Sequence, residues 1–193
     1  MLNNIAPRFI LELTATPRNN SNIISFVDAT QLKKENMVKL PVIVENRNSA
    51  KDVLVSAIRM RNSLEEHAKV MRQQGGKYIR PIVLFQAQPK TDDDNITFDK
   101  IKQNLVSFGI PEEEIKIKTA NRDELKGINL MSEQCPVRYI ITVNALKEGW
   151  DCPFAYILAT LANKTSAVDV EQILGRILRQ PYAMNHANAL LNI

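Results

Sequence analysis

Three continuous apolar segments constrain the fold of this chain more than any other feature. They read Arg-Pro-Ile-Val-Leu-Phe-Gln-Ala at residues 80–87, Val-Arg-Tyr-Ile-Ile-Thr-Val at 137–143 and Phe-Ala-Tyr-Ile-Leu-Ala-Thr-Leu at 154–161. Short runs of this kind are typical of central strands in a parallel sheet, because both faces of such a sheet are buried. Helical patterns alternate with these segments, so we predict an α/β fold in which helices cover both faces of a parallel sheet.

Two of these helices are predicted from apolar residues that recur at helical spacing. The first begins at the capping box of Ser49 and Asp52 and ends at Gly75 and Gly76. The second is shorter and closes at Gly109. Their apolar faces consist of Leu54, Ile58, Leu64, Ala68 and Met71 in the first, and of Phe98, Ile101, Leu105 and Phe108 in the second.

Shorter patterns predict the remaining elements. We expect strands at 8–13, 37–45 and 115–119, one helical turn at 121–126 and a further helix at 186–193. Pro41 interrupts the second of these strands, which favours a sheet edge or a bulge because proline cannot donate to the ladder. The sequence indicates no function for residues 20–48.

The composition excludes several classes of protein. The formal net charge is +4 and the pI about 9.1, a mild basicity that permits a nucleic-acid partner without requiring one. The two cysteines, Cys135 and Cys152, cannot form a disulfide framework, so we expect a reducing, cytoplasmic environment. No apolar run approaches the roughly 18 residues of a membrane span. The acids at 92–94 lack the spacing of a calcium loop, and we expect no metal site.

Residues 168–181 are predicted as an amphipathic helix. Ser166 and Asp169 form a capping box at its start, and Pro181 marks its stop. Five apolar residues fall on one stripe at helical spacing: Val170, Ile173, Leu174, Ile177 and Leu178. The helix should therefore bury this stripe against the sheet.

Gln172, Arg176 and Arg179 stand at i, i+4 and i+7 and should project together from another face of that helix. Two guanidiniums beside an amide suit a polyanion such as a phosphate, although a solvated polar face is the simpler interpretation of the triad alone. Gly175 favours a binding role. A glycine inside a helix costs about 1 kcal/mol relative to alanine, which indicates that something packs or binds close to the backbone there.

Small and polar residues also follow the predicted strands. In parallel sheets, ligands bind at the carboxyl ends of the strands. The residues just past predicted strand ends are Thr14, Thr16, Gln86, Gly149 and Asp151. We expect them to gather at one edge of the sheet, with an ordinary turn as the simpler alternative for Thr14 and Thr16 alone.

Four stretches resemble, in order and spacing, the third to sixth motifs of superfamily 2 helicases and translocases. They are Thr14-Ala-Thr16-Pro17, the strand 82–86, the segment from Thr142 through Gly149-Trp150-Asp151-Cys152-Pro153, and Gln172-Ile-Leu-Gly175-Arg176-Ile-Leu-Arg179. The last matches Gln-x-x-Gly-Arg-x-x-Arg at every defining position. The two stretches that resemble the fifth and sixth motifs are most similar to the Res subunit of type III restriction-modification enzymes. The resemblance covers about residues 9–183.

The resemblance implies two RecA-like domains that clamp one ATP between them, the second of which is this chain. It makes Arg179 the arginine finger on the γ-phosphate, with Arg176 beside it and Gln172 positioning the finger or the attacking water. It also implies roles in nucleotide binding and coupling for Gly149, Asp151, Gly175, Thr14 and Thr16, and in nucleic-acid binding for Thr142 and Gln86.

The sequence departs from the family because it holds no Gly-x-x-x-x-Gly-Lys-Ser/Thr and no Asp-Glu motif before Thr14. We therefore expect a piece of a larger motor. Residues 1–20 would end the first RecA-like domain, 21–48 would connect the domains, 49–183 would form the second RecA-like domain, and 184–193 would begin a following helix.

In that larger motor ATP and Mg²⁺ would be the cofactors, with the Mg²⁺ ligands outside this chain. The expected partners are DNA, the first RecA-like domain and a modification methyltransferase subunit, with no membrane. The chain alone should hydrolyse no ATP. The alternatives are another superfamily 2 helicase or remodeller, including one that acts on RNA, and a non-catalytic nucleic-acid-binding module.

Overall fold

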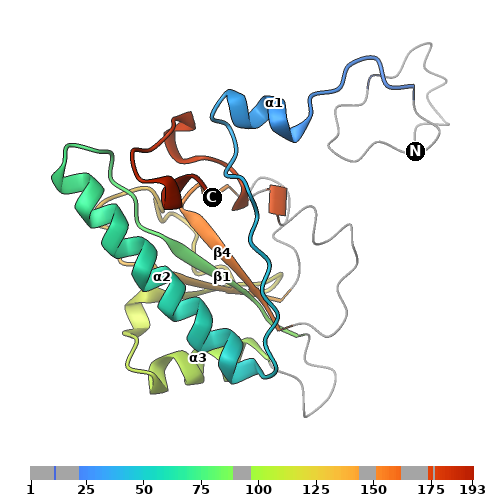
Figure 1. Ribbon diagram of the computed structural model, residues 1–193. Coiled ribbons are helices and arrows are strands. Elements are labelled where there is room, and N and C mark those ends of the chain that lie inside the picture. Colours follow the sequence, from blue (N-terminus) through green and yellow to red (C-terminus); the bar gives the residue numbers. More distant parts are fainter. Residues whose placement is uncertain (1–10, 12–21, 89–96, 144–150, 162–173, 176) are drawn as a thin grey trace.

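The structure is a computed structural model that describes residues 11, 22–88, 97–143, 151–161, 174–175 and 177–193. Its central feature is a four-stranded sheet (Figure 1). The strands are β1 (Ile82–Gln86), β2 (Ile115–Lys118), β3 (Tyr139–Thr142) and β4 (Ala155–Thr160), in the spatial order β2-β3-β1-β4. All three pairings are parallel. The predicted α/β parallel sheet is therefore confirmed, and it is consistent with a RecA-like fold.

The burial of the strands follows from their sequences. Every residue of β1 and β3, the two central strands, is buried, as expected for runs that are apolar on both faces. In β2, at one edge, Ile115 and Ile117 are buried while Lys116 and Lys118 are half-buried. The strand predicted at 115–119 is therefore confirmed, and it lies at an edge of the sheet.

Two long helices cover one face of the sheet. The helix α2 (Ala50–Gln73) starts where the Ser49 side chain accepts a hydrogen bond from the amide of Asp52, and α3 (Phe98–Ser107) is capped in the same way by Thr97. Figure 1 shows α3 beside the amino-terminal half of α2. The shared core of this face comprises Leu54 and Ala57 of α2, Ile101 and Leu105 of α3, and the strand residues Val83, Phe85, Tyr139 and Ile141.

The opposite face is covered mainly by loops and short helical turns. The segment between β2 and β3 contributes Leu125 and Leu130, a helical turn contributes Ile177, and the 3-10 helix η4 (Ala189–Asn192) contributes Leu191. The carboxyl-terminal part of α2 also reaches this core through Ala68 and Met71. The other short helices are α1 (Ala29–Lys34), η2 (Glu112–Glu114) and η3 (Pro181–Ala183).

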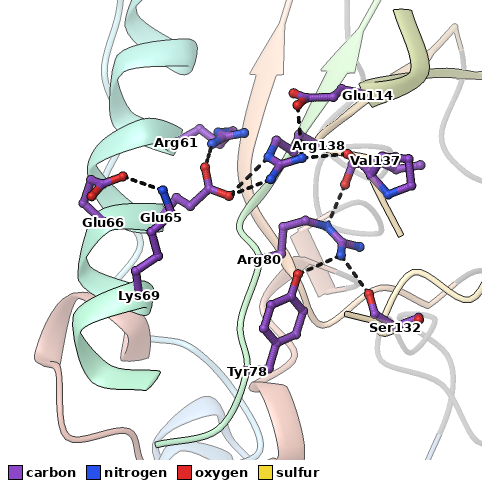
Figure 2. A network of polar contacts seen from close by, with 11 residues as sticks. Arg61, Glu65, Glu66, Lys69, Tyr78, Arg80, Glu114, Ser132, Val137 and Arg138 are labelled. Atoms are coloured by element: carbon purple, nitrogen blue, oxygen red, sulfur yellow. Dashed lines mark hydrogen bonds and ion pairs between the residues drawn. The ribbon is translucent and has the colours of Figure 1, made fainter. Parts of the chain in front are cut away.

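Arginines and glutamates form a polar network at the amino ends of β1 and β3 (Figure 2). Arg138 ion-pairs with Glu65 of α2 and with Glu114 of η2, each at 3.1 Å, and Arg61 of α2 also ion-pairs with Glu65. Burial and Arg138 act in opposite directions on the pKa of Glu114, and burial, the larger effect, raises it. Each of these four charged residues meets an opposite charge of the same chain, and the contact between Arg138 and Glu65 ties α2 to the sheet.

Three predicted elements are wrong in detail. Residues 37–45 form no strand. Their β pairing is limited to a single antiparallel bridge between Val38 and Arg179. Residues 121–126 form a tight reversal in which Asp123 bridges to Lys118, in place of a helical turn. The predicted helix at 186–193 is the four-residue η4, which the Asn188 side chain caps. The predicted strand at 8–13 lies outside the described residues except for Leu11.

The predicted helix at 168–181 ends earlier than Pro181 suggests. Among the described residues of this stretch, Leu174, Gly175 and Ile177 are helical, and the amide of Leu178 donates the last helical hydrogen bond, to Leu174. Beyond it, backbone groups of residues 37–39 pair with those of residues 178–180. Gln180 is extended, as a residue before proline prefers to be.

Candidate functional site

Polar residues line up across the carboxyl ends of the four strands. Gln86 of β1 lies opposite Thr142 of β3 and opposite Thr160 of β4, while Thr142 lies opposite Lys118 of β2. We call these four residues the carboxyl-end row. Each is the last residue of its strand. The sheet therefore presents a polar line at the edge where α/β proteins bind ligands.

The structure brings the predicted pair Gln86 and Thr142 together but buries both. They are 5% and 2% exposed, whereas Thr160 is exposed and Lys118 is 26% exposed. Lys118 also ion-pairs with Asp123 and thereby lowers the pKa of that carboxyl. Sequence reasoning missed Thr160 and Lys118, although both stand at the ends of predicted strands. They are the members of the row that solvent reaches.

A second group of predicted residues meets near the start of β4. Arg179 Nη1 donates a hydrogen bond to Asp151 Oδ2 at 2.6 Å, although the two residues are 28 positions apart in sequence. Their side chains are 57% and 44% exposed. One belongs to the stretch that resembles the fifth helicase motif and the other to the stretch that resembles the sixth. An exposed guanidinium of this kind can bind an external anion.

Because Asp151 follows the predicted strand at 137–143, we expected it at the carboxyl ends of the strands. It does not lie in the carboxyl-end row. It lies four residues before β4 begins, at the amino end of that strand. Parallel neighbours require the connecting chain to return to the opposite edge of the sheet, and Asp151 follows that return. The Arg179–Asp151 pair and the carboxyl-end row therefore lie at opposite ends of the sheet.

Arg179 also departs from the predicted helical face. It lies in an extended segment that pairs with Val38, flanked by hydrogen bonds from Lys39 N to Leu178 O (2.6 Å) and from Gln180 N to Met37 O (2.9 Å). Side chains alternate along an extended chain. Arg179 accordingly points to solvent, while Gln180 is buried.

The neighbourhood of Gly175 is open. This residue is exposed, and no atom of the described residues lies within 4 Å of the position that a Cβ would take. The close packing that we predicted there is therefore not made by the described part of the chain. Thr14, Thr16, Gly149, Gln172 and Arg176 lie outside the described residues.

Lys39 is a functional candidate that sequence reasoning missed. It is 1% exposed, and its Nζ donates to the carbonyls of Pro153 (3.0 Å) and Ala155 (2.7 Å) and lies 4.0 Å from the centre of the Tyr156 ring. Burial lowers the pKa of Lys39 to about 7 and raises that of the neighbouring Cys152 thiol to about 11. The only sequence signal was a lysine inside the apolar run Met37-Val-Lys39-Leu.

The described ranges hold neither a cluster of metal ligands nor a helix that could span a membrane. These ranges bring no three His, Cys, Asp or Glu residues together in a way that could hold a metal ion. None of their helices combines the length and apolarity that crossing a bilayer requires.

Comparison with known proteins adds no relative to this picture. No family model matches the sequence, and neither the curated proteins nor the solved structures contain a match. A function for this chain must therefore be inferred from its residues and their geometry.

Proposed function

We propose that this chain is the second RecA-like motor domain of an ATP-dependent DNA translocase, of the kind found in the Res subunit of type III restriction enzymes. The observation that carries the proposal is the 2.6 Å contact between Arg179 and Asp151. Two residues from separate helicase-like stretches meet in an exposed pair on a parallel α/β sheet, where a neighbouring domain can reach them.

The chemistry of Arg179 fits a phosphate. Guanidinium carries five N–H donors in a planar fork, and within the described residues Asp151 accepts from only one of its nitrogens. The remaining donors can bind phosphate oxygens while Asp151 keeps the side chain oriented. Stabilising the charge on a transferring phosphoryl group in this way is worth roughly 10³ to 10⁵ in rate. Arg176 and Gln172 would assist from the same stretch.

ATP and Mg²⁺ would be held largely by another domain. The sequence contains no phosphate-binding loop, and the described residues offer no acidic cluster for a metal. We propose that a first RecA-like domain supplies both, and that Thr14, Thr16, Gly149 and Gly175 couple the two domains. DNA would cross the carboxyl-end row, a methyltransferase subunit would be a further partner, and the location would be cytoplasmic.

The test joins this chain to a first RecA-like domain that carries a phosphate-binding loop and measures DNA-stimulated ATP hydrolysis. We expect turnover with the unmodified chain and a loss of roughly a thousandfold or more with Arg179→Ala, at an unchanged melting temperature. Arg72→Ala is the matched control, because Arg72 is also about half exposed and ion-pairs with the distant Glu133 at 2.9 Å. It should leave turnover intact.

The other outcomes of this assay separate the alternatives. Full turnover with Arg179→Ala would remove the arginine-finger assignment. Stimulation by RNA in place of DNA would favour another superfamily 2 helicase. Nucleic-acid binding without any turnover would favour a non-catalytic binding module. The chain without the first domain should be inactive in all of these assays.

A further inference from the structure

The segment 37–39 lies between the two stretches that carry Arg179 and Asp151. On one side its backbone pairs with residues 178–180 through Lys39 N to Leu178 O and Gln180 N to Met37 O. On the other side, the Lys39 side chain donates to the carbonyls of Pro153 and Ala155, which lie two and four residues after Asp151. One residue thus contacts both stretches.

Burying the Lys39 ammonium costs free energy, so its hydrogen-bond partners must be well placed. A lysine that is 1% exposed has given up its hydration, and the cost is offset only when its ammonium finds well-placed partners. Two carbonyl oxygens and the face of Tyr156 supply them. These partners hold Lys39 in one position relative to the start of β4.

The Arg179–Asp151 pair cannot fix its own geometry. Both side chains are about half exposed, and an exposed ion pair contributes no more than about 1 kcal/mol. Its two backbones must therefore be held by other contacts. Among the hydrogen bonds of the described residues, those that link residues 178–180 to residues 153–155 through a single residue are the backbone and side-chain bonds of Lys39.

We propose that Lys39 is a positioning residue that sets the placement of Arg179 relative to Asp151, so that displacing residues 37–39 separates the two charges. The segment 37–39 leads into α2 from the region that carried no predicted function. Its catalytic meaning rests on the proposed function, but the positioning itself does not. The proposal can thus be tested without nucleotide or DNA.

The test follows the ¹⁵N signals of the Arg179 guanidinium by NMR in the 193-residue chain. The signals are assigned by their loss in Arg179→Ala, and Asp151→Asn gives their position without the carboxylate. We expect Lys39→Met, which keeps the length of the side chain but not its donors, to move the signals at least halfway to the Asp151→Asn position.

Lys33→Met is the matched control. The Lys33 Nζ also donates to a carbonyl, that of Asn192 at 2.9 Å, but it does not contact the start of β4. It should leave the Arg179 signals in place. Unmoved signals in a folded Lys39→Met chain, or equal movement in both variants, would overturn the proposal.

A measurement on the unmodified chain covers the case in which Lys39→Met does not fold. Urea is raised while amide exchange at Lys39 and Gln180 and the Arg179 signals are followed together. We expect the three to be lost at the same urea concentration, before or with the rest of the sheet. Arg179 signals that persist after both amides have opened would contradict the inference, whatever the ATPase assay gives.

Discussion

Arg80 is 1% exposed, and its guanidinium donates to four oxygens of this chain, whereas the Arg179 side chain is 57% exposed and donates to one oxygen among the described residues. The acceptors of Arg80 are the carbonyls of Ser132 and Val137 and the hydroxyl of Tyr78, which Figure 2 shows, and the carbonyl of Leu130. They hold the loop between β2 and β3 against the start of β1. Arg179 instead stands at a surface, with donors that the described residues leave unused.

The comparison shows how to separate a structural arginine from a binding one. Both follow or precede apolar runs, and both carry the same charge. What differs is how completely the chain itself satisfies the guanidinium. A side chain that gives four of its five N–H donors to its own chain, as Arg80 does, cannot bind a ligand through them without losing stability, while one that keeps spare donors in solvent can.

The largest effect that this comparison predicts is on stability. Arg80→Met would leave four acceptors without their donor, two of them in fully buried hydrogen bonds, and we expect a loss of roughly 3–5 kcal/mol in the free energy of unfolding. Arg179→Met should change it by less than about 0.5 kcal/mol, because an exposed pair contributes little. Urea denaturation of both variants measures the difference. Equal losses would mean that Arg179 is also structural.

A smaller effect concerns Lys39, which combines burial with a place beside the site. The pKa of Lys39 is about 7 in the folded chain and ordinarily 10.5. Between pH 7 and pH 10.5 the Lys39 amine is therefore mostly protonated in the unfolded chain and mostly neutral in the folded chain. Unfolding therefore takes up a proton, and raising the pH from 7 to 9 should stabilise the fold by roughly 2 kcal/mol.

The Cys152 thiol acts in the opposite direction, because burial raises its pKa from 9.0 to about 11, and its ionisation in the unfolded chain lowers the stability as the pH approaches 9. This thiol is present in both chains, so comparing them isolates Lys39, while burial keeps the pKa of Tyr156 above this range and lowers that of His186. The Lys39→Met chain should lack this gain in stability. Unfolding curves at pH 7, 8 and 9 for both chains provide the measurement. A wild-type stability that stays flat or falls over this range would show that Lys39 is not buried as described.

Much of the fold could be predicted because its determinants are local. The runs that form β1 and β3 are apolar on both faces whatever their neighbours are, and the cap at Ser49 involves residues three positions apart. The place of Gln86 at the end of a strand could be predicted in the same way. These features need no knowledge of which distant segments meet.

The remainder depends on contacts between distant segments. Pro181 marks a helix stop, yet the helix ends earlier because residues 37–39 pair with residues 178–180. The burial of Lys39 depends on the carbonyls of Pro153 and Ala155. Because every residue has a backbone carbonyl, the sequence does not show which carbonyls a lysine will contact. Asp151 was expected with Gln86 because it follows one strand, although the structure places it just before the next.

The weakest expected effect is on DNA binding. We expect weak binding without sequence preference, because phosphate contacts carry no sequence information. Lys118→Ala, in the carboxyl-end row, should reduce the slope of log affinity against log salt by about one. Lys69→Ala on α2, also ion-paired to a nearby acid, should not. Fluorescence anisotropy on two unrelated DNA sequences measures both; a strong preference for one sequence would point to base recognition.

Because the surroundings of Gly175 are open, a larger side chain at this position can affect stability and turnover differently. A methyl group there would meet no atom of the described residues, and alanine favours a helix over glycine by up to about 1 kcal/mol. Gly175→Ala should therefore make the isolated chain slightly more stable. If a nucleotide or a second domain approaches this backbone during turnover, the same methyl group would obstruct it. If Gly175→Ala raises the melting temperature but lowers ATP turnover, then the glycine has been kept at the expense of helix stability because a nucleotide or a second domain binds beside it.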